Sequence, residues 1–287
     1  MIDYVSIDTN TFPLEEDPRH AGKRTQVLLP PAEMQGGVVR VSYWPPGFTE
    51  QIRKLIAHGG HRHYHRSVNE RHYVLGGDWT ILHWPADRKL VRTRLHRHHY
   101  LENPPLALHG ISRDFPPETG TKFLVWTSGA GTDIYEPAAK QESIDVDFDG
   151  DDIPDHVRAS PIVFNAEDRS WQPHPEHAPW LLKPLSASAP GQPEAALVNI
   201  PAGSHARFDV SSPQSQLKSW LFVVSGDLAV TATGVRNTPE EIELHEGGFL
   251  AWGRAGRISS RSGPVSRGGC VALCVGHRLA TAARPAE

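Results

Sequence analysis

Residues 61–77 read HRHYHRSVNERHYVLGG and place histidines on both sides of a single glutamate, ahead of a glycine pair. The histidines are His61, His63, His65 and His72, and the glutamate is Glu70. His63 and His65 are two residues apart, so on a β-strand their side chains would point to the same face. Four residues separate His65 from Glu70, which is enough for a turn into a neighbouring strand. His72, two residues beyond Glu70, should share its face.

A further histidine follows in YLENPPLALHG (100–110), where His109 begins a later strand after a proline-rich turn. Two histidines on one strand, a glutamate on its neighbour and a third histidine from elsewhere can converge inside a small barrel. Imidazole and carboxylate groups together bind Fe, Mn, Ni, Cu or Zn. A polar cluster without metal is the alternative. A register that uses His61 and His63 with Glu70 is a second alternative.

Short strands dominate the rest of the chain. Gly 25 and Pro 25 among 287 residues favour many turns over long helices. Strands are expected at residues 37–44, 78–84, 89–96, 122–128, 195–200, 219–226, 227–233 and 269–276. VLGGDWTI (74–81) and VVSGDLAV (223–230) form a weak internal repeat, and each reads as a hairpin at Gly-Asp. We therefore predict an all-β protein with two similar domains.

The connection between the two halves is rich in Asp, Pro, Ser and Ala. We expect one domain at residues 1–140, an acidic, proline-rich connection at 141–170 and a second domain at 171–287. The stretch DVDFDGDDIPDH (145–156) begins like a calcium-binding loop, but its twelfth position is His156 instead of glutamate. A solvated acidic linker is the favoured interpretation, with a calcium site as the alternative.

Composition excludes several kinds of partner. A net charge of -4 gives no electrostatic reason to expect nucleic acid or an anionic membrane. No apolar run approaches the ~18 residues of a membrane helix, and MIDYVSIDTN is too polar for a secretory signal. Cys270 and Cys274 are expected to be reduced core thiols. The expected location is the cytoplasm.

These motifs resemble the cupin superfamily. The first cupin motif, G-x5-HxH-x(3,4)-E-x6-G, is matched by His63, His65, Glu70 and Gly77. The second, P-x-G-x-x-H, is matched by Pro104 and His109, with Leu106 at the glycine position. The resemblance implies two double-stranded β-helix (jelly-roll) barrels. It also implies one metal ion bound by His63, His65, Glu70 and His109.

Aligning Gly226 with Gly77 places Ser212, Gln214 and Ser219 opposite His63, His65 and Glu70, and Ile258 opposite His109. None of these four residues is a strong metal ligand. We therefore expect one tightly bound metal per chain, with the second half a metal-free cupin domain that supports a homodimer.

By resemblance, the first half is similar to small cupin dioxygenases. The favoured function is a non-heme iron dioxygenase, with Fe(II) over Zn, Mn, Ni or Cu, that cleaves a small enolisable carbonyl or phenolic compound with O2. Glu70 and His72 are the candidate catalytic residues, as ligand or base and as substrate-orienting group. The alternatives are a redox-silent isomerase, lyase or hydrolase using Zn, Mn or Ni, and a non-catalytic metal-binding or ligand-binding bicupin. The sequence leaves open which of Arg53, Arg71 and Arg97 faces the site.

Overall fold

The chain forms two compact β-sheet units in the computed structural model. We call Leu14–Asp168 the first unit, and Met1–Pro13 together with Arg169–Glu287 the second unit. The predicted all-β fold of two jelly-roll barrels is confirmed. The structure describes residues 4–11, 13–17, 22–34, 37–46, 62–87, 89–111, 119–128, 155–175, 177–186, 195–205, 209–211, 219–234, 238–253, 257–260, 263 and 265–276.

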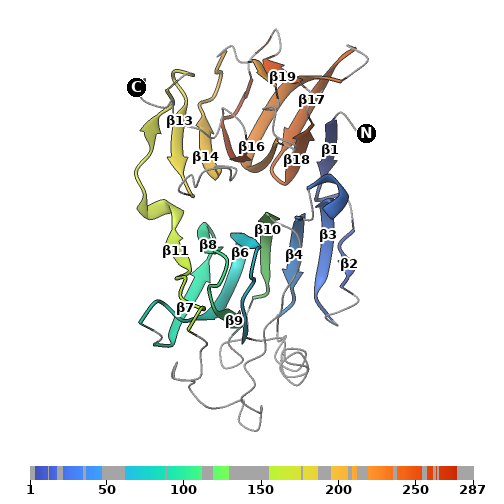
Figure 1. Cartoon of the computed structure of the whole chain (residues 1–287). Coiled ribbons are helices and arrows are strands. Elements are labelled where there is room, and N and C mark those ends of the chain that lie inside the picture. Colours follow the sequence, from blue (N-terminus) through green and yellow to red (C-terminus); the bar gives the residue numbers. More distant parts are fainter. Residues whose placement is uncertain are drawn as a thin grey trace. The chain divides into compact units, whose positions relative to one another are not determined.

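The first unit is a sheet in the order β11-β8-β6-β10-β4-β3-β2, with β5, β7 and β9 joined through β6 (Figure 1). The strands are β2 (Glu15–Glu16), β3 (Arg24–Leu29), β4 (Val39–Trp44), β5 (Arg62–His63), β6 (Asn69–His83), β7 (Val91–His96), β8 (His99–Asn103), β9 (His109–Ile111), β10 (Thr121–Ser128) and β11 (Ile162–Asn165). Short 3-10 helices occur at Pro31–Glu33 and Ala166–Asp168. Among the described residues, no helix combines the length and apolar character needed to cross a membrane.

The second unit repeats this arrangement in the order β1-β18-β16-β20-β14-β13-β12, with β15, β17 and β19 joined through β16 (Figure 1). The strands are β1 (Tyr4–Asp8), β12 (Gln172–Pro173), β13 (Leu181–Pro184), β14 (Ala195–Ile200), β15 (Asp209–Ser211), β16 (Ser219–Thr233), β17 (Pro239–His245), β18 (Gly248–Trp252), β19 (Arg257–Ser260) and β20 (Cys270–Val275). The first strand of the chain, β1, pairs with β18 and so lies in the second unit.

The long central strands correct the expected hairpins. β6 and β16 each run unbroken through their Gly-Asp pair instead of reversing there. Gly77 has φ +76° and Gly226 has φ +82°, and a β-carbon on either would lie under 2 Å from the carbonyl oxygen of Gly120 or Gly269. Each glycine therefore lets the strand kink while staying paired. Before the kink β6 pairs with β8 and β10, and after it with β7 and β9.

One face of the first unit's sheet carries an apolar core built on an aromatic group. Trp79 stacks on Phe123 with ring centroids 5.2 Å apart, and Trp44 tilts against both rings. Val74, Ile81, Leu95, Leu101 and Val125 complete this buried cluster. A smaller cluster of Tyr64, Trp84, Leu108 and Val157 lies beside β5 and β9. These two clusters hold in place the strands that carry His63, Glu70 and His109.

Candidate metal centre

His63, His65, Glu70 and His109 come together in the first unit, and one ligand atom from each lies within 4.8 Å of the others. β5 pairs with β9 so that His63 is directly opposite His109. β9 in turn pairs with the far half of β6, whereas Glu70 lies on its near half. The kink at Gly77 therefore lets one half of β6 carry Glu70 while the other half pairs with β9, which carries His109. Donor atoms on opposite sides of one ion are about 4 Å apart, so the spacing suits a single metal.

Glu70 lies at the centre of these contacts. Its Oε2 lies 3.3 Å from Nε2 of His109 and 3.8 Å from Nε2 of His65. The amide nitrogen of Asn103, a fully buried residue on β8, donates to the same oxygen at 3.4 Å. The other oxygen, Oε1, lies 3.9 Å from Nε2 of His72. Glu70 is thus surrounded by nitrogen atoms.

Burial and charge set the protonation states that a metal requires. Burial, aided by His109, holds the pKa of His63 well below its usual value. Burial lowers the pKa of His72 to about 4, against the opposing effect of Glu70. Burial raises the pKa of Glu70, but the nearby His72, His109 and His65 outweigh it and keep that pKa well below its usual value. Neutral imidazoles beside an ionised carboxylate are the forms that bind transition metals.

Unsatisfied ring nitrogens indicate that these residues fit a cation. His109 Nδ1 donates to the carbonyl of Ala107 at 2.9 Å, and its other ring nitrogen, Nε2, faces Glu70 at 3.3 Å. That Nε2 atom and both ring nitrogens of His65 are buried without a well-formed hydrogen bond among the described residues. A buried polar group without a partner destabilises the fold by about 1–3 kcal/mol. A metal ion would satisfy these nitrogens and the carboxylate together.

The turn before His109 keeps its shape although Leu106 stands where the second cupin motif has glycine. Leu106 occupies that position with φ +68°, in the left-handed region that favours glycine. Its backbone N–H donates to the carbonyl of His65 at 2.7 Å, and that of Ala107 donates to Pro104 at 3.1 Å. Leu106 also packs on the small cluster around Tyr64. The turn therefore ties the loop carrying His65 to the strand carrying His109.

His72 lies at the junction between this centre and the aromatic core. Its ring is 5.5 Å from the rings of both Trp79 and Phe123, and its side chain is buried. Nδ1 of His72 has no hydrogen-bond partner among the described residues. His72 shares the face of Glu70, as expected, and is placed to contact a molecule held beside it.

The other histidines and the arginines are spread more widely. His58, His61 and Arg53 lie outside the described residues, so the rival register that uses His61 stays untested. His83 is buried and lies directly opposite His109 across β6 and β9, and its Nε2 lies 2.9 Å from Thr93 Oγ1. His96 and Arg97 are exposed. Most of the calcium-like stretch 145–156 also lies outside the described residues.

Arg71 is fully buried but lies on the opposite face of β6 from Glu70 and His72. There its guanidinium pairs with Glu102 at 3.1 Å. Glu102 also accepts hydrogen bonds from Asn69 and from the hydroxyl of Tyr100, each at 2.7 Å. Arg71 therefore belongs to a structural network and not to the metal centre.

Two cations that were not predicted from the sequence lie on the same face as His72. Arg40 on β4 is opposite Val125 on β10, which is opposite His72 on β6. Lys23, just before β3, is buried and forms an ion pair with Asp17 at 3.4 Å. Alternating polar residues in VVRVSYW (38–44) were the available signal for Arg40.

The second unit has apolar residues where the first has its ligands. Strand pairing places Leu221 at the position of His72 and Ile258 at that of His109. Ser219 replaces Glu70, and its hydroxyl donates to the carbonyl of Gly276 at 2.5 Å.

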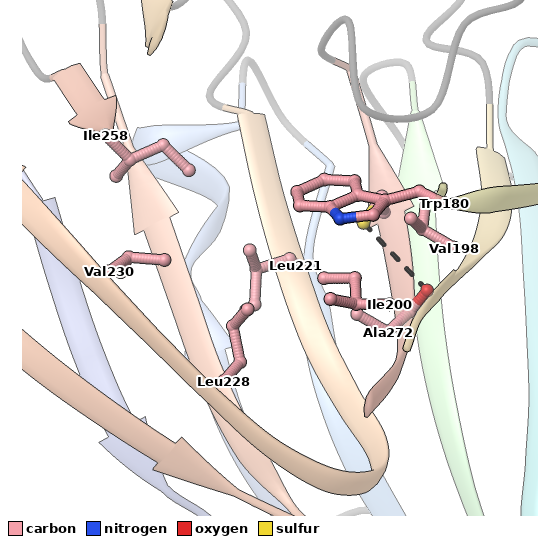
Figure 2. A pocket seen from close by; sticks show the side chains of 9 residues that line it. Trp180, Val198, Ile200, Leu221, Leu228, Val230, Ile258 and Ala272 are labelled. Atoms are coloured by element: carbon pink, nitrogen blue, oxygen red, sulfur yellow. Dashed lines mark hydrogen bonds between the residues drawn. The ribbon is translucent and has the colours of Figure 1, made fainter. Parts of the chain in front are cut away.

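The pairing of β15 with β19 corrects the sequence alignment. It puts Val210 opposite Ile258, so Val210, and not Ser212, corresponds to His63. Ser212 and Gln214 lie outside the described residues. Leu221 and Ile258 line a small apolar space, with room for about one water molecule (Figure 2).

Solved structures match this arrangement over nearly the whole chain. A variant of oxalate decarboxylase from Bacillus subtilis matches with TM-score 0.59 at 11% identity, covering 96% of this chain and 78% of that one. The chain has the bicupin fold. Protein Ylba from E. coli matches with TM-score 0.60 at 10% identity, covering 99% of this chain and 93% of that chain. The formate complex of oxalate decarboxylase from Lactobacillus farciminis matches with TM-score 0.59 at 11% identity, covering 96% of this chain and 86% of that one.

At these identities the likeness establishes the fold. No protein-family model matches the sequence of this chain, and no curated protein matches it.

Proposed function

We propose that this bicupin is a metal-dependent enzyme, a non-heme iron dioxygenase that cleaves a small enolisable carbonyl or phenolic compound. The observation that carries the proposal is the convergence of His63, His65, Glu70 and His109 within 4.8 Å. Four protein ligands leave positions open on a metal that takes six, so a substrate and O2 could both be accommodated. Iron(II) bound there would supply O2 activation and would lower the pKa of a coordinated enol or phenol.

The residues around the cluster support a planar, oxygen-bearing substrate. His72 is neutral because burial lowers its pKa to about 4, so it can donate one hydrogen bond to a substrate oxygen. Trp79 and Phe123 pack against the His72 ring and offer an apolar surface beside it. Glu70 serves as a ligand or, when a substrate displaces it, as a base at close range. Asn103 holds one Glu70 oxygen in place at 3.4 Å.

A redox-silent reaction is the second candidate. The fold neighbours named oxalate decarboxylase support a carbon–carbon bond cleavage that Mn, Zn or Ni could assist. The cations Arg40 and Lys23 near the cluster favour a substrate with negative charge, which either reaction class could accept.

Oxygen-electrode measurements on the full chain, loaded separately with Fe(II), Zn, Mn or Ni, test the proposal. A panel of β-diketones, hydroxyketones, catechols and small carboxylic acids should give O2 uptake with iron alone. His109→Ala should abolish uptake and remove the metal, whereas His96→Ala, an exposed histidine on β7, should leave both unchanged. Turnover of an acid without O2 uptake would move the assignment to the redox-silent class.

A further inference from the structure

Two buried or half-buried cations occupy the sheet wall next to the candidate metal centre. Arg40, Val125 and His72 form one row across β4, β10 and β6, and residues directly opposite each other point to the same face. Neighbouring strands are about 4.8 Å apart, so the Arg40 and His72 backbones are separated by about 10 Å. An arginine side chain spans most of that distance.

Lys23 lies in the same neighbourhood. Its backbone carbonyl accepts from the N–H of Asp17 at 2.8 Å, and its ammonium pairs with the Asp17 carboxylate at 3.4 Å. Burial and the charge of Arg40 lower the pKa of Lys23 to about 8, although Asp17 and Glu70 both oppose this. Lys23, which pairs with Asp17, and Arg40 thus bring two positive charges into the neighbourhood of Glu70, and an added anion would be attracted to them.

The second unit shows that the fold itself does not require these cations. Strand pairing places Ala196 at the position of Arg40 and Leu221 at that of His72. Trp180 corresponds to Lys23, because its carbonyl accepts the same 2.8 Å hydrogen bond, here from the N–H of His174. Trp180 lines the apolar space of the second unit together with Leu221 (Figure 2). Lys23, the equivalent residue of the first unit, therefore points into the interior of that unit, as His72 does.

We propose that Arg40 and Lys23 form an anion-binding subsite, and that the substrate is a small organic anion whose carboxylate lies on this subsite. The proposal rests on the proposed function in that another oxygen of the same molecule contacts the metal beside Glu70 and His72. A guanidinium binds a carboxylate through two parallel hydrogen bonds, so Arg40 would also fix the orientation of the substrate. Lys23 would add charge with less directional preference.

The test is binding to the zinc-loaded full chain, which needs no turnover. Isothermal titration compares salicylate with salicylamide, two probes that share the phenol and differ in the carboxylate. Wild-type protein should prefer salicylate, and Arg40→Gln should weaken salicylate binding roughly 10-fold to 100-fold while changing salicylamide binding less than about twofold, since a hydrogen bond to a charged group is worth about 1.5–3 kcal/mol. Arg40→Lys should retain part of the preference.

Arg92→Gln is the matched control, because Arg92 is an exposed arginine on β7 of the same unit. It should bind both probes like the wild type. Metal content near one equivalent and an unchanged melting temperature show that each variant is folded. Equal affinity of wild type for both probes, or equal losses for both in Arg40→Gln, overturns the subsite.

The two proposals fail in different ways. Preference for salicylate without O2 uptake by the iron-loaded chain leaves the subsite standing and removes the dioxygenase. O2 uptake with neutral diketones, combined with no preference between the probes, removes the subsite and leaves the dioxygenase.

Discussion

Replacing Gly77 by alanine should damage the first unit far more than the same change one residue earlier. A β-carbon on Gly77 would lie 1.7 Å from the carbonyl oxygen of Gly120, whereas a β-carbon on Gly76 meets nothing within 4 Å. Real β-carbons essentially never come closer than 3.0 Å, so the Gly120 carbonyl must retreat by at least 1.3 Å, the difference between the two distances. That movement opens the pairing of β10 with β6 at Thr121.

The magnitude follows from three contributions. An alanine held at φ +76° is destabilised by about 1 kcal/mol relative to glycine. Two ladder hydrogen bonds next to the clash contribute about 1 kcal/mol each. The lower chain entropy of unfolded alanine offsets about 0.5 kcal/mol of this loss. We expect Gly77→Ala to lower the free energy of unfolding by about 2–3 kcal/mol, and the melting temperature by roughly 5–10 °C.

Urea unfolding followed by tryptophan fluorescence, with Gly76→Ala measured in parallel, checks this expectation. Gly76→Ala should stay within about 0.5–1 kcal/mol of the wild type. Metal affinity should fall in Gly77→Ala as well, because the kink aligns Glu70 on one half of β6 with His109, which pairs with the other half. Equal stability of the two variants would refute the role given to the kink.

Three further changes test other parts of the first unit. Tyr64→Phe, a change next to His65 in the sequence, removes the 2.9 Å hydrogen bond to His156 and should lower the free energy of unfolding by about 1 kcal/mol in urea titrations. Lys23 has a pKa of about 8 when folded and 10.5 when unfolded, so the unfolded chain binds more protons between these values and stability should rise with pH there. The gain is roughly 3 kcal/mol, complete above pH 10.5 and lost as pH falls through 8, and Lys23→Met should remove this pH dependence. The double change His72→Leu and His109→Ile should make the melting temperature insensitive to chelator, whereas chelator should lower that of the wild type.

Local sequence signals predicted the repeat and the cluster well, because both depend on short-range chemistry. Gly77 and Gly226 aligned the two halves of the sequence correctly, because both positions have positive φ and face a backbone carbonyl, where only glycine fits readily. The spacing of His63, His65 and Glu70 matched the first cupin motif, and these residues do converge, although His65 lies in the loop after β5 and not on the same strand as His63.

Long-range pairing could not be predicted in the same way. The sequence reads β1 as the start of the first domain, but its partner is β18, more than 200 residues away. The Gly-Asp pairs suggested hairpins because a kink and a turn use the same residue types. Arg40 lies on a different strand from Glu70, and because the pairing of β4, β10 and β6 could not be predicted from the sequence, the face that Arg40 shares with His72 could not be predicted either.

Comparison of the two units separates what the fold needs from what the site adds. Both units keep the kinked central strand, with Gly120 facing Gly77 in one and Gly269 facing Gly226 in the other. The second unit achieves this with Leu221 and Ile258 at the interior positions, so burying polar groups there is not a requirement of folding. Histidines and a carboxylate at the same positions of the first unit leave buried nitrogens unsatisfied, which lowers its stability without a bound cation. The fold tolerates apolar residues at these positions, yet the first unit carries the destabilising histidines and carboxylate. Selection for a ligand that binds the first unit best explains this difference between the units.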